Sequence, residues 1–177
     1  MTVKTQLMDA VTMRRSLARI THEIIEHNDG VENIIVLGIQ TRGVPIAEVL
    51  QANIEKFEGR KVPAGQLDIT LHRDDLNEAE KTERAHGSFI PCDVTGKTVI
   101  LVDDVMFTGR TARAAMEAVI QLGRPKYIQL AVLVDRGHRE LPIRPDYVGK
   151  NVPTSMEENV AVHIKPIDKD DGVYITE

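Results

Sequence analysis

The sequence contains no tryptophan, few other aromatic residues and a single cysteine, Cys92, among its 177 residues. One cysteine excludes an internal disulfide bond and fits a reducing compartment, so we expect a cytoplasmic protein. The sequence also lacks an apolar run of about 18 residues, so no membrane-spanning helix is expected. The formal net charge is −5, which argues against a surface coated with nucleic acid but permits a local basic patch.

What is present is an alternation of apolar runs and helical patterns, in a chain long enough for one domain with a full core. The spacing predicts helices from Asp9 to about His27, over 44–57 and over 111–123. It predicts buried strands over 33–39, 98–102 and 127–135, a half-buried strand over 65–73 and a short strand over 160–166. Buried strands that alternate with helices predict an α/β fold, with a central, mainly parallel sheet and helices on both faces.

Three loops follow strands of this predicted sheet, at 40–43, 103–111 and 135–142. Ligands of open α/β sheets bind beyond the carboxyl ends of the strands, so these loops form the expected binding site. The segment 74–88 (DDLNEAEKTERAHGS) is mostly polar and charged. We interpret it as a mobile surface loop and as a candidate lid over the site.

Residues 99–111 (VILVDDVMFTGRT) place two carboxylates at the end of a buried strand and then start a helix. The N–H groups and dipole of a helix N-terminus favour a phosphate, and Gly109 permits the positive φ that such a turn needs. Asp103 and Asp104 would repel that phosphate and should face another group, for which the vicinal hydroxyls of a sugar are suited. The stretch therefore predicts a ribose 5-phosphate site, and the alternative is an acidic strand end with an ordinary helix cap.

Other phosphate and metal motifs are absent: the sequence has neither GxxxxGK[ST] nor GxGxxG after a strand, and its histidines lack zinc-site spacing. Residues 99–111 resemble the phosphoribosyl-pyrophosphate motif of type I phosphoribosyltransferases. The stretches 38–47 (GIQTRGVPIA), 68–76 (DITLHRDDL) and 129–155 resemble a more specific group, the bacterial pyrimidine operon regulators that are also uracil phosphoribosyltransferases. This resemblance covers nearly the whole chain.

The resemblance implies the type I phosphoribosyltransferase fold as a single domain over 1–177, with a small hood from the terminal regions and a flexible lid around 74–88. It implies the reaction of uracil with phosphoribosyl pyrophosphate to give UMP and pyrophosphate, with Mg²⁺ as cofactor. Because the anomeric carbon gains oxocarbenium character, catalysis is mostly electrostatics and positioning and needs no protein nucleophile. Two residues depart from better-known members: Ala18 replaces a threonine and His72 a tyrosine.

The family's roles carry over to matching residues. Asp103, Asp104 and Arg73 are the expected catalytic residues, Arg84 belongs to the lid, and Asp135 lies near a Mg²⁺ held mostly by the substrate. Thr41 and Arg42 are expected to hold the pyrophosphate, although their Thr-Arg-Gly sequence by itself indicates only a turn. The expected substrate-binding residues are Thr41, Arg42, Asp103, Asp104, Val105, Met106, Phe107, Thr108, Gly109, Arg110, Thr111, Asp135, Arg136 and Val160.

Basic side chains form two sets, one opposite the apolar face of the first predicted helix and one after the third buried strand. Taken alone, the first set indicates a solvated helix face. The resemblance implies instead that both sets contact the leader mRNA of a pyrimidine operon, under control of UMP or UTP, in a homodimer or higher homo-oligomer. Glutamine at Arg19 or Arg139 is then expected to weaken RNA binding and spare catalysis. The expected RNA-contacting residues are Arg15, Arg19, His22, His138, Arg139, Arg144 and Lys150.

Two alternatives from other classes stay open. The chain could be a phosphoribosyltransferase alone, for another base such as a purine, or a non-catalytic nucleotide sensor on the same fold. Uracil-dependent release of pyrophosphate separates an enzyme from a sensor. Binding of leader RNA separates a regulator from an enzyme alone, whether the regulator acts by transcription attenuation or by translational repression.

Overall fold

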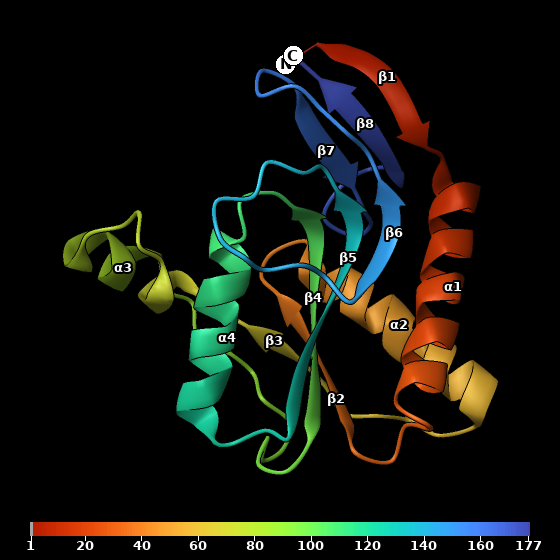
Figure 1. Ribbon diagram of the computed structural model, residues 1–177, viewed down its shortest axis with the longest axis vertical. Coiled ribbons are helices and arrows are strands. Elements are labelled where there is room, and N and C mark those ends of the chain that lie inside the picture. Colours follow the sequence, from red (N-terminus) through yellow and green to blue (C-terminus); the bar gives the residue numbers. More distant parts are fainter. Residues whose placement is uncertain (1) are drawn as a thin grey trace.

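Five strands form the central sheet of the computed structural model, which describes residues 2–177 (Figure 1). Their order across the sheet is β3-β2-β4-β5-β6. The strands are β2 (Ile34–Ile39), β3 (Ala64–Leu67), β4 (Thr98–Met106), β5 (Tyr127–Asp135) and β6 (Tyr147–Asn151). All neighbouring strands are parallel, which confirms the predicted α/β fold with a mainly parallel sheet.

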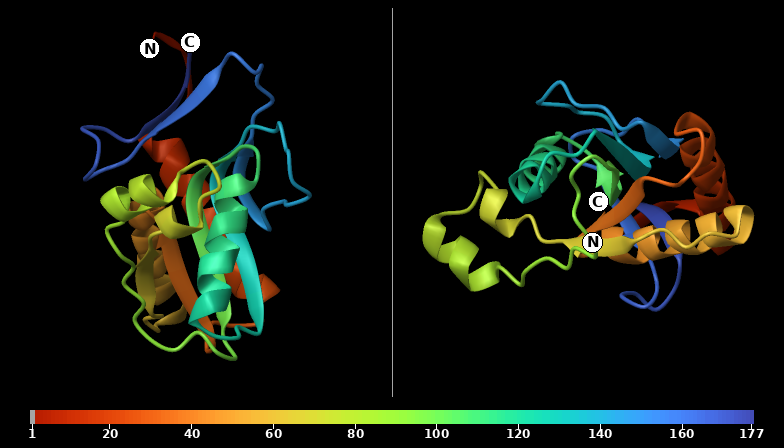
Figure 2. Two further views of the ribbon diagram at one scale, coloured as in Figure 1. Left: turned by 90° about the vertical axis from the view of Figure 1, so that its left-hand side faces the viewer. Right: turned by 90° about the horizontal axis from the view of Figure 1, so that it is seen from below.

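Helices cover both faces of this sheet. Helices α1 (Ala10–His27) and α2 (Gly43–Glu58) pack on one face, and α4 (Arg110–Leu122) packs on the other (Figures 1 and 2). The start of α1 is fixed as the sequence predicts, because the Asp9 carboxylate accepts a hydrogen bond from the Thr12 N–H at 2.8 Å. Among residues 2–177, no helix is long and apolar enough to cross a membrane.

Both ends of the chain contribute to a second, antiparallel sheet, which we call the hood. It contains β1 (Val3–Met8), β8 (Gly172–Thr176) and β7 (Asn159–His163), in the order β1-β8-β7. The hood lies beyond the carboxyl ends of the central strands, and the two termini end side by side (Figure 1). Its apolar side chains Val162 and Val173 join the hydrophobic core under α1 and α2, so the hood is packed firmly onto the central sheet.

The structure differs from the sequence prediction around the third strand. β3 ends at Leu67 instead of residue 73, because the Asp68 carboxylate accepts a hydrogen bond from the Thr70 N–H at 2.9 Å and the chain turns into a 3₁₀ helix at Thr70–His72. Segment 74–88 is not irregular throughout. It contains α3 (Glu78–Arg84), which begins with a capping box formed by Asn77 and Glu80 and projects away from the body of the protein (Figures 1 and 2).

Two features of the sheet bring the loops of interest together. Strand β4 continues past residue 102 to Met106, so Asp103 and Asp104 lie in the strand, and Asp103 pairs with Val132 of β5. The first residue of α2 is Gly43, where an added Cβ would lie 2.2 Å from the Val102 carbonyl oxygen. Only glycine allows this approach, which places the loop after β2 directly beside the two carboxylates of β4.

Candidate active site

A cavity of about 440 Å³ opens at the carboxyl ends of the central strands. Its walls come from segments far apart in the sequence, as expected for a site in an open parallel sheet. Residues that line it are Ile39, Gln40, Thr41, Arg42, Asp68, Ile69, Thr70, Arg73, Leu76, Arg84, His86, Asp103, Asp104, Val105 and Thr111. The structure thus brings the three residues expected to be catalytic together with the two expected to hold pyrophosphate.

Asp103 and Asp104 form the acidic part of this cavity. Each carboxylate accepts a hydrogen bond from the N–H of the following residue, Asp103 from Asp104 at 2.9 Å and Asp104 from Val105 at 2.8 Å. Burial, followed by the adjacent charge of Asp104, raises the pKa of Asp103 well above its ordinary value. Two crowded carboxylates therefore face the cavity, and neutral donors such as sugar hydroxyls would satisfy them without adding charge.

The turn between β4 and α4 has the geometry of a phosphate site. Residues 105–109, Asp103 and Thr111 line a small cavity of about 90 Å³, which the core residues Ala112, Leu130 and Val132 close on its other side. Gly109 has φ 95°, a left-handed conformation, and it precedes the first turn of α4. Because the N–H groups of a helix's first turn have no partners within the helix, this turn can bind an anion.

The side chain of Arg110 points away from this turn. It bonds to Asp74 at the start of the candidate lid, 2.7 Å away, and to Glu140 in the loop after β5, 2.6 Å away. The Arg110 N–H donates to Thr108 Oγ1 at 3.3 Å, a long contact that a phosphate oxygen can replace, while the guanidinium connects two surface segments. Its expected role in substrate binding is accordingly confined to the main chain.

Asp68 is a site residue that the sequence reasoning missed. Burial disfavours its charge, but hydrogen bonds from Thr70 and from the N–H groups of His86 and Gly87 lower the pKa of Asp68. The carboxylate therefore ties the C-terminal end of segment 74–88 to the turn after β3. Nothing in the sequence indicated this role, because Asp68 falls inside the strand predicted over 65–73 and only the observed end of β3 at Leu67 places it in the turn.

The positions expected around the base occupy the loop after β5, beside a cavity of about 480 Å³. Asp135, Arg139, Arg144 and Asn151 are among its lining residues. Arg136 does not line it: this buried side chain donates to Thr154 and to two backbone carbonyls, and its guanidinium lies 4.1 Å from the centre of the Phe107 ring. Arg136 therefore links the loop after β5 to the segment around residues 154–158 and is not free to bind a ligand through its side chain.

Arg139 is committed to contacts inside the protein. It forms an ion pair with Asp135 and donates to the carbonyls of Phe107 at 2.9 Å and Ile143 at 2.8 Å. The expectation that Arg139→Gln spares catalysis is therefore revised, because this side chain holds Asp135 and the phosphate turn in place. His138 is also engaged, with its ring nitrogen 2.6 Å from the Thr154 carbonyl oxygen.

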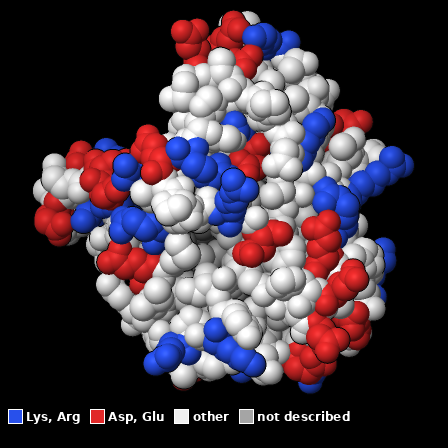
Figure 3. All heavy atoms as spheres, in the orientation of Figure 1, with Lys and Arg blue, Asp and Glu red and all other residues white. Residues whose placement is uncertain are grey.

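The remaining basic residues lie on or beside α1 and β6. Arg15, Arg144 and Lys150 are exposed, and Arg19 crosses from α1 to donate to the carbonyls of Val148 and Gly149 in β6. Figure 3 shows Lys and Arg side chains over the upper part of α1 and β6 and acidic side chains below them. His22 instead stacks on a phenylalanine of α2, with ring centroids 4.2 Å apart.

Three other residues singled out in the sequence, Val160, Met106 and His72, pack against the core or against α4. Val160 packs from the hood onto the core, and Met106 is buried in the core under α4. His72, which replaces a tyrosine, contacts α4: its carbonyl accepts from Arg113 at 2.6 Å, and its ring lies 4.0 Å from Glu117. None of the three lines the 440 Å³ cavity.

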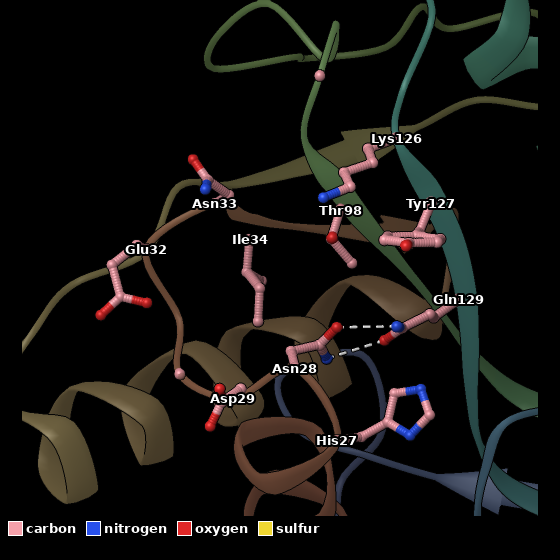
Figure 4. A pocket seen from close by; sticks show the side chains of 12 residues that line it. His27, Asn28, Asp29, Glu32, Asn33, Ile34, Thr98, Lys126, Tyr127 and Gln129 are labelled. Atoms are coloured by element: carbon pink, nitrogen blue, oxygen red, sulfur yellow. Dashed lines mark hydrogen bonds between the residues drawn. The ribbon is translucent and has the colours of Figure 1, made fainter.

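A further cavity of about 430 Å³ lies at the opposite, amino end of the sheet (Figure 4). Its floor is a closed amide pair, in which Asn28 and Gln129 donate to each other at 2.9 and 2.8 Å. Tyr147 also donates to Gln129, at 2.6 Å, so these polar groups are satisfied by one another. No cluster of cations converges here that would hold a substrate with several phosphates.

Residues 4–166 match the family described as the phosphoribosyl transferase domain. A protein named "Bifunctional protein PyrR" from Clostridium novyi is 60% identical over 177 residues, covering 100% of this chain and 99% of its own length. Proteins of the same name from Clostridioides difficile and Thermus thermophilus are each 56% identical over 177 residues, covering all of this chain and 100% and 98% of their own lengths. The chain belongs to the PyrR family of phosphoribosyltransferases.

Solved structures carry the same fold at low identity. A hypoxanthine-guanine phosphoribosyltransferase from Bacillus anthracis superposes with a TM-score of 0.75 at 17% identity, covering all of both chains. A hypoxanthine phosphoribosyltransferase from Trypanosoma cruzi gives 0.75 at 15% identity, covering 99% of this chain and 96% of its own. These comparisons confirm the type I phosphoribosyltransferase fold of this PyrR family member.

Phosphoribosyltransferases generally use Mg²⁺ with phosphoribosyl pyrophosphate. Among residues 2–177, no group of three or more metal-binding side chains gathers into a cage. Asp135 is already paired with Arg139, which makes it a poor direct ligand. Asp103 and Asp104 in the cavity fit a Mg²⁺ that takes most of its ligands from a diphosphate and from water.

Proposed function

We propose that this protein transfers the 5-phosphoribosyl group of phosphoribosyl pyrophosphate to uracil, giving UMP and pyrophosphate, and that it also regulates pyrimidine genes by binding their leader mRNA. The observation that carries the enzymatic part is the 440 Å³ cavity, where Asp103 and Asp104 face Arg42, Arg73 and Arg84 next to the phosphate turn. Full-length identity of 56–60% to proteins named as bifunctional supports the regulatory part.

In the proposed mechanism the 5′-phosphate binds the turn at residues 108–111, and the ribose hydroxyls donate to Asp103 and Asp104. The carboxylates then lie beside the anomeric carbon and stabilise the positive charge that develops as pyrophosphate departs. Thr41 and Arg42 hold the leaving diphosphate, whose charge a bound Mg²⁺ would reduce. Uracil is held beside Asp135, and its N1 bonds to the anomeric carbon as the bond from that carbon to the pyrophosphate oxygen breaks. The N1 proton leaves with the departing diphosphate, so no protein nucleophile is needed.

Water must be kept from the oxocarbenium-like centre, which is the role we assign to segment 74–88. Arg73 and Arg84 line the cavity from the root of this segment and from α3. Helix α3 has no buried residue, and Arg73 is paired with Asp75 at 2.5 Å on the segment itself. A segment with so few packed contacts can rearrange over a bound substrate at low energetic cost.

Amide hydrogen exchange tests the lid. Without ligand, residues 74–88 should exchange quickly because they bury little surface, and phosphoribosyl pyrophosphate with Mg²⁺ should slow their exchange. The second half of α1, residues 20–27, lies away from the cavity and serves as an internal control that should not change. Exchange in 74–88 that is the same with and without substrate would remove the lid from the mechanism.

Binding of UMP should tighten the binding of leader RNA. Asp135 beside the proposed base site is paired with Arg139, and the following loop leads to the exposed Arg144 and to β6 with Lys150. A nucleotide that orders Asp135 should order this basic surface. The expected coupling is about 1–3 kcal/mol, or roughly 5- to 150-fold in affinity. Because coupling is reciprocal, titration of UMP with and without RNA should give the same factor, and equal RNA affinities with and without UMP would contradict it.

One assay series tests both parts of the proposal. Pyrophosphate release from phosphoribosyl pyrophosphate is measured with uracil, with hypoxanthine and without a base, and the same preparation is titrated with leader RNA. Release only with uracil, together with RNA binding, is the expected result. Release with hypoxanthine instead would favour an enzyme for another base, and no release would leave a nucleotide sensor. We also propose that the protein is cytoplasmic and that it forms a homodimer or higher homo-oligomer. Light scattering, which measures molar mass, tests the oligomeric state.

A further inference from the structure

The hood contributes a side chain to the loop that is proposed to hold pyrophosphate. Asp168, in the loop between β7 and β8, faces Arg42, 126 positions earlier in the chain. The Arg42 Nε donates to Asp168 Oδ2 at 3.2 Å, and Nη2 donates to Oδ1 at 2.9 Å. This is a two-point carboxylate–guanidinium contact, which fixes the plane of the guanidinium as well as its distance.

The Asp168 carboxylate is itself held by its own loop. Its Oδ2 atom accepts the Ile164 N–H at 2.9 Å, and the Asp168 N–H donates to the Ile164 carbonyl, also at 2.9 Å. Only 17% of the Asp168 side chain is exposed, against 39% for Arg42. The hydrogen bonds and charge of Arg42 lower the pKa of Asp168, so this carboxylate is ionised at neutral pH. The aspartate is thus the fixed partner, and it determines where the longer arginine side chain lies.

The contact leaves donors of Arg42 available. A guanidinium has five N–H groups, and the two-point contact uses one on Nε and one on Nη2. The remaining hydrogen of Nη2 and one hydrogen of Nη1 form a second edge, and the other Nη1 hydrogen points back along the side chain. Arg42 lines the 440 Å³ cavity beside Thr41, so a diphosphate in this cavity can accept hydrogen bonds from that edge.

We propose that Asp168 is a positioning residue for phosphoribosyl pyrophosphate, which holds one edge of Arg42 so that the other edge is ready for the diphosphate. This inference rests on the proposed function, in which Arg42 binds that group. Fixing a long side chain before binding removes the cost of ordering it on binding, which corresponds to roughly two- to tenfold in affinity. The opposite role would be a latch that must release Arg42 before substrate can bind.

Steady-state kinetics with Asp168→Asn distinguish these roles. The variant should raise KM for phosphoribosyl pyrophosphate by about two- to tenfold and change kcat by less than twofold, because the chemistry at the anomeric carbon is untouched. Binding of Mg²⁺ pyrophosphate, measured by calorimetry, should weaken by the same factor. Asp168→Glu should restore part of the affinity, since the charge and the two acceptor atoms remain.

Asp170→Asn is the matched control, because Asp170 lies in the same loop but pairs with His163 and Tyr174. It should leave KM unchanged. Arg42→Lys tests the same contact within an intact hood: lysine keeps the charge but lacks the two-donor edges, so KM should rise. In the double variant Arg42→Lys with Asp168→Asn, KM for phosphoribosyl pyrophosphate should not exceed that of Arg42→Lys alone, because the aspartate acts through Arg42.

The remaining outcomes separate this inference from the proposed function. A lower KM in Asp168→Asn would identify a latch and overturn the positioning role. An unchanged KM in Asp168→Asn beside a raised KM in Arg42→Lys would also overturn it, while the proposed function stands. An unchanged KM in Arg42→Lys would show that a positive charge at this position is sufficient without an oriented guanidinium edge, which would overturn the inference and leave the proposed function standing.

Discussion

Replacing Asp103 or Asp104 by asparagine is expected to lower the turnover number for UMP synthesis by about two to three orders of magnitude, as large as the effect of removing one preorganised hydrogen-bond donor from an oxyanion hole. Asparagine has nearly the same shape and still accepts hydrogen bonds, so the ribose can bind. It has no negative charge to stabilise the oxocarbenium-like carbon. The loss should therefore appear in kcat at saturating substrates and less in KM.

The Asp103→Asn substitution should also stabilise the ligand-free protein at neutral pH. Burial and the charge of Asp104 raise the pKa of Asp103 in the folded state, so the folded state binds its proton more tightly than the unfolded chain does. Stability therefore falls as pH rises from the ordinary pKa of an aspartate to the raised value, and the loss is complete above that value. Asp103→Asn removes this loss. Its melting temperature should exceed that of the parent at pH 7, and the difference should shrink toward pH 4.

Asp93→Asn is a suitable control, because Asp93 is an exposed carboxylate in a turn before β4 and bonds only locally, to the Thr95 N–H at 2.9 Å. It should retain full turnover. Parent-like kcat in both Asp103→Asn and Asp104→Asn would contradict the proposed role of these carboxylates. A loss of kcat accompanied by a lower melting temperature would point to a damaged fold instead.

The two carboxylates and the phosphate turn could be predicted from the sequence, because they lie next to one another in the chain. Within residues 99–111, an apolar strand, two acids, a glycine and a helix start follow one another directly, and each is dictated by short-range chemistry. The buried strands and the amphipathic face of α1 were predictable for the same reason. The strands β1, β6 and β8 were not predicted, because they are short, lie at sheet edges or in the hood, and alternate only weakly in hydrophobicity.

Contacts between distant segments were not predictable. The Arg42–Asp168 pair joins residues 126 positions apart, and nothing in either local sequence indicates it. Asp68 closes the base of segment 74–88 through residues 18 and 19 positions away. Arg139 stands in a basic stretch that suggests an exposed surface, yet the fold turns it toward Asp135. In each case a polar side chain has a partner that only the tertiary structure supplies.

These inward contacts decide which basic residues can be used to test RNA binding. Arg139 and His138 hold the loop after β5, so their substitution would disturb the proposed base site as well. Arg15, Arg144 and Lys150 are exposed on or beside α1 and β6, and none of them lines the 440 Å³ cavity. Arg144 lies closest to the proposed base site, where it lines the 480 Å³ cavity, so Arg15 and Lys150 are the cleaner probes.

The double variant Arg15→Gln with Lys150→Gln should therefore lose RNA binding and keep its enzymatic activity. Each basic residue that contacts a phosphate of single-stranded RNA contributes about 0.7 to the slope of log affinity against log salt concentration, so the slope should flatten by about 1.4. Leader RNA is titrated at several salt concentrations, and UMP synthesis is assayed on the same preparation. The control carries Arg124→Gln and Lys126→Gln at the amino end of the sheet, where the same change in net charge should leave the slope as it is. If both double variants bind RNA as tightly as the parent, or lose the same amount, the surface of α1 and β6 is not the RNA site and only the enzymatic part of the proposal remains.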